Sequence, residues 1–294
     1  MNPVIPSGEK HLVVYIKRGA VRLSTPAHVA ELADAYASGA YGETRGGSSP
    51  LVSIIFNSTQ PTTCAMAIAK EQPESVRELF SSIAKRYRTV NHLLSGGLDF
   101  YWRAIAVRMI RTWRPGSVLD VATGSGDLAL AIGRGCPGCR VVGADFCRPM
   151  LDVARANGMD ELVEADGMKL PFSDASFDAV TAAFGLRNMA SWEKGLSEMA
   201  RILKPGGHLL ILDFSLPTLP LVRPLYRAYL HHVLPVMAGI ATGRKDAYEY
   251  LGGSIEQFPS GAAMTSLINT CGLKNASAYP LSLGTVSIYT AEKP

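Results

Sequence analysis

The sequence has few of the features that mark membrane, secreted and nucleic-acid-binding proteins. Charged residues make up only 18% of the 294 residues, and the net charge is +4. Because the Lys and Arg residues are scattered rather than grouped in a stripe, this charge indicates no nucleic-acid partner. No apolar run approaches the roughly 18 residues of a membrane-spanning helix. The hydrophobic share of 47% is typical of a globular enzyme.

Cysteines are also few, and their spacing predicts neither disulfides nor a metal site. Their odd number, five, favours a reducing compartment over secretion, so we expect a cytoplasmic protein. Cys136 and Cys139 form a CxxC motif, but the sequence has no second CxxC and no paired histidines at zinc-finger spacing. We interpret the Pro-Gly between them as a turn before a strand and predict no metal.

Residues 1–65 lack clean apolar periodicity and are rich in turn-forming residues. We expect this part to be disordered or non-native. The segment Arg45–Pro50 can be written in codons that contain GGTTCAAGTCC, which is the T-arm consensus of transfer-RNA genes. We therefore hypothesise that the start codon is misplaced and that the protein begins at Met66, so that residues 66–294 form the functional domain.

From residue 117 onward, strand patterns alternate with helical patterns, which predicts a parallel α/β sheet. A helical, apolar insertion follows at about residues 216–258. Two final runs separated by Leu283-Gly284 predict a hairpin, so the last strand should be antiparallel. The predicted strands before the insertion are Ser117–Val121, Arg140–Ala144, Glu161–Glu164, Phe177–Ala182 and His208–Phe214, and the predicted helices among them are Asp127–Gly133, Arg148–Ala156 and Trp192–Leu203.

The stretch VLDVATGSGDLALAIG (Val118–Gly133) predicts a strand, a turn of small residues and a helix. Its spacing fits a dinucleotide fingerprint as well as an S-adenosylmethionine site. Asp120 lies just before the turn, and a carboxylate there repels a diphosphate but attracts a sulfonium cation. Together with the DxGxGxG-like motif and the Pro-Gly-Gly turn before the last parallel strand, it favours S-adenosyl-L-methionine and a Rossmann-like class I methyltransferase.

The chemistry of that cofactor suggests a role for each residue of the motif. Gly124 and Gly126 lack Cβ atoms, so the backbone can approach the methionine part. Ser125 can bind the carboxylate end, and Asp145, at the end of the second strand, can accept from the ribose hydroxyls. Asp166, at the end of the third strand, can accept from the adenine amino group, with the Gly167 N–H beside it.

The most specific motifs are Phe184–Asn188 (FGLRN) and Tyr248–Pro259 (YEYLGGSIEQFP). With them, the chain from about Glu74 to Tyr289 closely resembles the demethylmenaquinone and polyprenyl-benzoquinol C-methyltransferase family. Further matches are LF.SIA.RY..VN.L.S.G (Leu79–Gly97) and Trp102-Arg103. The sequence departs from the family at Arg88 and His92, where acidic residues are usual, at Ala183, where serine is common, and at Asp213, where glutamate is usual.

The resemblance implies a seven-stranded, mostly parallel sheet with a helical cap, and methylation of a prenylated quinol, most simply demethylmenaquinol. Methylation of a polyprenyl-benzoquinol and a non-catalytic quinone-binding role remain the alternatives. Ring methylation needs help with a hydroxyl proton, so we expect Arg187 to stabilise the developing phenolate or orient a water. Tyr87 could close over the same site. The alternative for Arg187 is a salt bridge that holds the cap.

The apolar insertion suits a polyprenyl tail better than a polar acceptor. It would also fit peripheral contact with the inner face of the membrane, or a surface between copies of the chain, and the sequence does not separate these partners.

Overall fold

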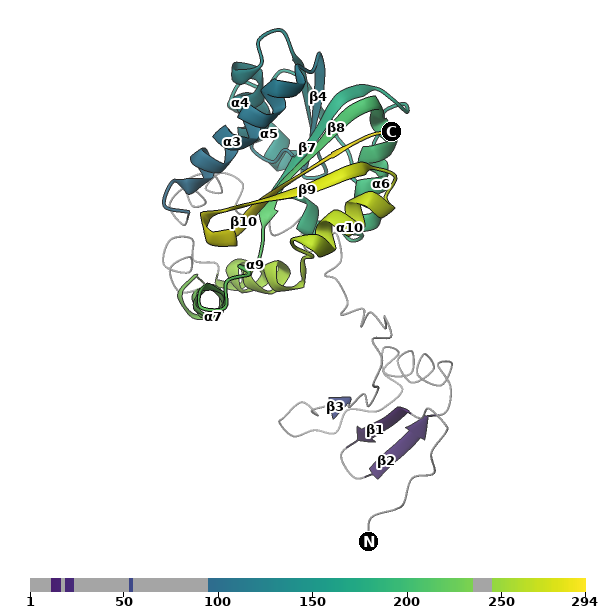
Figure 1. Ribbon diagram of the computed structural model, residues 1–294, viewed down its shortest axis with the longest axis vertical. Helices are drawn as coiled ribbons and strands as arrows, with labels where there is room; N and C mark the ends of the chain where they lie inside the picture. The colour runs from purple at the N-terminus through teal and green to yellow at the C-terminus, as the bar shows by residue number, and fades with distance from the viewer. Residues whose placement is uncertain (1–11, 17–18, 24–52, 55–94, 235–244) are drawn as a thin grey trace. The chain divides into compact units, whose positions relative to one another are not determined.

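The computed structural model describes residues 12–16, 19–23, 53–54, 95–234 and 245–294 (Figure 1). The chain divides into two compact units, Met1–Ala67 and Ile68–Pro294. In the first unit, β1 (Leu12–Ile16) pairs with both β2 (Gly19–Leu23) and β3 (Ser53–Ile54) in an antiparallel sheet. The start at Met66 stays a hypothesis.

The second unit contains a seven-stranded sheet with the order β6-β5-β4-β7-β8-β10-β9. Six of these seven strands point in the same direction, and β10, which lies between β8 and β9, runs antiparallel to both of its neighbours. This confirms the predicted fold class. The strands are β4 (Ser117–Val121), β5 (Arg140–Asp145), β6 (Leu162–Glu164), β7 (Phe177–Ala183), β8 (Leu203–Phe214), β9 (Lys274–Leu281) and β10 (Val286–Glu292).

Alternation of side chains along the central strands divides the core into two layers. On β8, Leu209 and Ile211 join the cluster that contains residues of α6 and α10, whereas Leu210 and Leu212 join the cluster that contains residues of α3 and α4. Helices therefore cover both faces of the sheet (Figure 1). Their bounds are α3 (Leu98–Trp113), α4 (Asp127–Gly135), α5 (Arg148–Ala156), α6 (Trp192–Ile202) and α10 (Ala262–Thr270).

The strand β8 begins earlier than the sequence predicts. The Pro-Gly-Gly segment was expected as a turn, yet the strand includes it, with a register shift where β7 pairs with β8 between Phe177 and Ala179. Gly206 has a φ of 74° and donates its amide to the carbonyl of Lys293 at 2.9 Å. Lys293, directly after β10, thus pairs with the Pro-Gly-Gly segment through backbone hydrogen bonds.

After β8 the chain leaves the sheet to form α7 (Val222–Ala228), the π-helical turn η2 (Tyr229–Val233) and α9 (Lys245–Gln257). Leu230, Leu234 and Ile255 form a small buried cluster there, and Phe214 at the end of β8 packs against it. The helical segment is thereby anchored at the carboxyl end of the sheet. In the part of the chain that the structure describes, no helix is long and apolar enough to cross a bilayer.

Candidate active site

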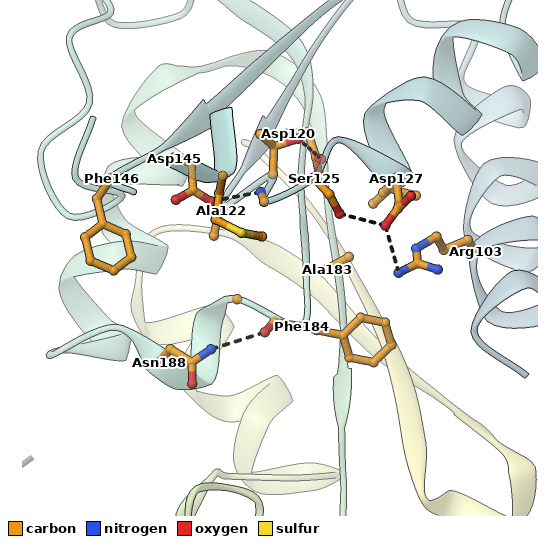
Figure 2. A pocket seen from close by; sticks show the side chains of 15 residues that line it. Arg103, Asp120, Ala122, Ser125, Asp127, Asp145, Phe146, Ala183, Phe184 and Asn188 are labelled. Atoms are coloured by element: carbon orange, nitrogen blue, oxygen red, sulfur yellow. Dashed lines mark hydrogen bonds and ion pairs between the residues drawn. The ribbon is translucent and has the colours of Figure 1, made fainter. Parts of the chain in front are cut away.

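A pocket of about 680 Å³, part of it open to solvent, lies at the carboxyl ends of β4, β5 and β7. This edge is where an open parallel sheet binds its ligands. Figure 2 shows the side chains that line it. They are Arg103, Asp120, Ala122, Thr123, Gly124, Ser125, Asp127, Leu128, Asp145, Phe146, Met150, Ala183, Phe184, Gly185 and Asn188.

The turn after β4 is held to the end of β5 by Asp145. The Gly124 amide donates to Asp145 Oδ2 at 2.8 Å, and the Cys147 amide donates to Oδ1 at 2.9 Å. Burial raises the pKa of Asp145, while these amide donors oppose the rise. A carboxylate has about four lone-pair sites, so Asp145 can still accept from ligand hydroxyls, as the sequence predicts.

Both glycines of the turn have left-handed backbone, with φ of 55° at Gly124 and 80° at Gly126. Gly124 lines the pocket, but Gly126 does not. A Cβ on Gly126 would lie 2.8 Å from Met159 Sδ. This glycine therefore permits the left-handed turn and close packing against Met159, and its contact with the cofactor stays a prediction.

Asp120 is buried in the pocket wall between two threonines. Thr181 Oγ1 donates to Asp120 Oδ1 at 2.7 Å, and Thr123 Oγ1 donates to Oδ2 at 2.7 Å. Burial raises the pKa of Asp120 to about 6, although both hydroxyls and the charge of Arg103 act in the opposite direction. A cation in the pocket would favour the ionised form of this carboxyl.

Ser125 lies in the pocket and is linked through Asp127 to Arg103, two residues that the sequence analysis did not assign. Its Oγ donates to Asp127 Oδ2 at 2.9 Å, and Arg103 Nη2 lies 3.9 Å from the same carboxylate oxygen. Arg103 lies on α3, the helix that precedes the alternating strands and helices in the sequence. The Trp102-Arg103 motif match was the signal that could have pointed to it.

The two residues predicted at the end of β6 lie outside the pocket lining. Asp166 is exposed and accepts from the Met168 amide at 2.9 Å through Oδ1, which is a local turn contact. A Cβ on Gly167 would lie 2.6 Å from Met189 Cε, so this glycine packs closely against the end of the Met189 side chain. Their contact with adenine remains a prediction.

Arg187 also lies outside the pocket lining, in the short helix η1 (Leu186–Asn188). Its Nη1 donates to Asp213 Oδ1 at 2.7 Å and to the Phe184 carbonyl at 2.6 Å. Both side chains are buried, and the guanidinium lies over the ring of Phe214 at 5.2 Å from its centroid. The salt bridge considered for Arg187 is thus present. Tyr87 lies outside the described residues.

Burial raises the pKa of Asp213, and the Arg187 guanidinium opposes this rise. The charge of Arg187 also acts on Tyr226 of α7, whose hydroxyl pKa is raised mainly by burial. An ion pair at the ends of β7 and β8 is therefore electrostatically coupled to the helical segment beyond β8.

The comparisons with known proteins agree with this geometry. A sequence model described as the ubiE/COQ5 methyltransferase family matches residues 66–293. The chain belongs to this family. A demethylmenaquinone methyltransferase of Thermus thermophilus is 43% identical over 221 residues, which cover 74% of this chain and 100% of the relative. A C-methyltransferase UbiE of ubiquinone and menaquinone biosynthesis from Geobacter sp. is 41% identical over 78% of this chain and 100% of its own length.

A solved structure supports the fold. A SAM-dependent methyltransferase from Thermotoga maritima superposes with a TM-score of 0.55 at 17% identity, over 74% of this chain and 99% of that one. Within the pocket, the carboxylates of Asp120, Asp127 and Asp145 outnumber the single guanidinium of Arg103. This excess of negative charge fits a sulfonium ligand and disfavours a diphosphate. The prediction of S-adenosylmethionine as cofactor is confirmed, and the NAD alternative is discarded.

Proposed function

We propose that this ubiE/COQ5-family methyltransferase methylates a ring carbon of a prenylated quinol, most simply demethylmenaquinol to give menaquinol. The observation that carries the proposal is the acidic pocket at the carboxyl edge of the sheet, in a chain whose relatives at 38–43% identity include several named demethylmenaquinone methyltransferase. Relatives named for both ubiquinone and menaquinone biosynthesis make a polyprenyl-benzoquinol the second candidate acceptor.

S-adenosylmethionine, when bound, supplies an electrophilic methyl group on a sulfonium. The chain supplies the groups that hold it: Asp145 for the ribose hydroxyls, and Asp120 as a buried negative charge beside the glycine turn. Phe146, directly after Asp145, and Met150 of α5 give apolar surface in the same pocket. Positioning of this kind contributes strongly to a transfer between two bound molecules.

On the acceptor side, the ring must become electron-rich, which happens when a quinol hydroxyl loses its proton. We propose that Arg187 stabilises the developing phenolate or orients a water that takes the proton. As a guanidinium it stays protonated, so it does not itself accept the proton. The buried carboxylate of Asp213 holds the Arg187 guanidinium in a fixed orientation. This rigid ion pair supports the proposed role of Arg187.

The helical segment after β8 offers apolar surface for the prenyl tail. Leu221 and Leu225 are 81% and 69% exposed, and the buried face of the same segment packs on Phe214. We propose that this surface contacts the prenyl tail, or the bilayer in which the quinol dissolves. The fraction of protein that sediments with lipid vesicles should fall in the double variant Leu221→Ser/Leu225→Ser. If the double substitution instead dissociates an oligomer and leaves vesicle binding unchanged, the surface contacts a second copy of the chain.

Incubation with labelled S-adenosylmethionine and reduced quinones tests the proposal. A prenylated demethylnaphthoquinol and a polyprenyl-benzoquinol with an unmethylated ring carbon should be compared as acceptors by kcat/KM, with an unprenylated ring as control. We expect the naphthoquinol to be the best substrate and the unprenylated ring the worst. Binding of S-adenosylmethionine without transfer to any quinol would favour the non-catalytic quinone-binding alternative.

A further inference from the structure

The pocket contains one cationic side chain, Arg103, among the fifteen residues that line it. The cofactor assigned to this pocket carries one carboxylate, alongside its sulfonium and its ammonium group. Three carboxylates in the lining, those of Asp120, Asp127 and Asp145, would repel an anionic group. The position of Arg103 is therefore the favourable place for the ligand carboxylate.

Arg103 is held in position by its neighbours. It forms an ion pair with Asp99 one helical turn earlier on α3, and Asp99 is buried and accepts from Ser95 Oγ at 2.8 Å. The guanidinium also lies over the Phe184 ring, 5.9 Å from its centroid. A side chain fixed in this way loses little further conformational freedom when a ligand binds.

The guanidinium retains donor capacity. It has five N–H groups, and its hydrogen bond to Asp99 engages Nη1. Within the described residues, the buried Nε has no hydrogen-bond partner, and Nη2 lies 3.9 Å from Asp127 Oδ2. Planar guanidinium groups bind carboxylates through two parallel N–H donors.

Arg103 also lies at the correct end of the pocket. Figure 2 draws Asp145 and Phe146 on one side of the glycine turn and Arg103 with Asp127 on the other. With Asp145 at the ribose, the amino-acid end of the ligand extends toward α3. This step rests on the proposed binding of the ribose by Asp145.

We propose that Arg103 binds the carboxylate of the methionine part of S-adenosylmethionine, so that α3 supplies the anchor for the amino-acid end of the cofactor. This differs from the prediction made for Ser125, whose hydroxyl donates to Asp127. The Arg103–Asp127–Ser125 group then links α3, the start of α4 and the glycine turn around one end of the ligand.

The test compares S-adenosylmethionine with decarboxylated S-adenosylmethionine, which keeps the sulfonium and the amine but lacks the carboxylate. Dissociation constants are measured by calorimetry with the full chain. We expect the wild type to prefer the carboxylated ligand by about 10- to 100-fold, the range for a charge-assisted hydrogen bond. Arg103→Ala should reduce this preference to less than about 3-fold by weakening the carboxylated ligand alone.

Two further variants keep the result interpretable. Arg103→Lys retains the charge beside Asp99, so it should fold and keep part of the preference. Arg108→Ala removes an exposed arginine from the same helix and should leave the preference unchanged.

The outcomes separate cleanly. A preference that survives in both Arg103 variants, or equal weakening of both ligands, would overturn the assignment and give Arg103 a structural role. A wild-type protein that binds neither ligand would instead contradict the cofactor site itself.

Discussion

At the scale of single residues, the site contains carboxyl groups whose ionised form is disfavoured by burial. Burial is the main cause of the raised pKa at Asp120, Asp145 and Asp213. A buried charge without full compensation costs stability. These side chains therefore oppose folding in the absence of ligand, and a bound cation can recover part of that cost.

Asp120→Asn should stabilise the cofactor-free protein and weaken cofactor binding. The folded pKa of about 6 lies above the ordinary 3.8, so the stability from this group is fully present below about pH 3.8 and is lost as the pH rises through about 6. Removing the charge should therefore raise the free energy of unfolding near pH 7.5 by up to about 3 kcal/mol. Urea titration measures this, with the surface variant Asp160→Asn as control.

The same group predicts a pH dependence of binding. A cationic ligand favours ionised Asp120, so the affinity for S-adenosylmethionine should rise as the pH increases through about 6. In Asp120→Asn this rise should flatten. A wild-type profile that is level across that region, or an identical profile in the variant, would show that Asp120 is not the titrating group.

Arg187→Ala should reduce kcat strongly while the dissociation constant of S-adenosylmethionine changes little, because Arg187 lies outside the cofactor pocket lining. It should also lower stability by about 3–5 kcal/mol, since Asp213 is left as a buried charge without its partner. Adding Asp213→Asn should recover stability but not kcat. Equal losses of turnover and cofactor affinity would assign Arg187 to the structure of the cap.

At the scale of elements, two loops approach each other closely beside the pocket. Ala122, in the turn after β4, has a φ of 53°, and a Cβ on Gly185 would lie 2.4 Å from Ala122 Cβ. The turn that holds the cofactor and the loop that leads to η1 are thus in backbone-level contact. Under the proposed function, this contact lies between the cofactor-binding turn and the loop that leads to Arg187.

Gly185→Ala should therefore destabilise the protein by about 1–3 kcal/mol through overpacking and lower activity by moving the two loops apart. The control is Gly133→Ala in α4, where a Cβ would meet nothing within 4 Å. That change should raise stability by about 0.5–1 kcal/mol. Thermal unfolding and initial rates measure both effects; similar behaviour of the two variants would contradict the close approach.

The sequence predicts most of the elements because their signals are local. Alternating strand and helix patterns gave the parallel strands of the sheet. The small-residue turn identified Asp120, Gly124 and Ser125, and the end of the second strand identified Asp145; all four line the pocket. Arg103 was missed because it lies on a helix that precedes the first sheet strand and reaches the pocket only through tertiary packing. The packing of Gly126 against Met159 was also missed, because Met159 lies 33 positions later in the chain.

At the scale of the whole molecule, we propose that two parts of the second unit bind the two reactants. The sheet edge supplies an acidic pocket for a cationic cofactor, and the helical segment after β8 adds apolar side chains suited to a lipid-like acceptor. The family match covers residues 66–293. The function is therefore expected to reside in the second unit alone.

A chain that starts at Met66 should retain the full kcat and the cofactor affinity of the long chain. The reason is that the described pocket draws only on residues from Arg103 onward. Initial rates and calorimetry on the two chains provide the comparison, and mass spectrometry of the native protein would show which start is used. A large loss of activity in the shorter chain would contradict the interpretation of residues 1–65 as non-native.

The most direct test of the central claim is the mass of the product formed from prenylated demethylmenaquinol and S-adenosylmethionine that carries a CD₃ group. The account predicts one deuterated methyl group on a ring carbon, formed only with the reduced quinone. A methyl group on oxygen, or no transfer to a quinol by protein that binds the cofactor, would contradict it.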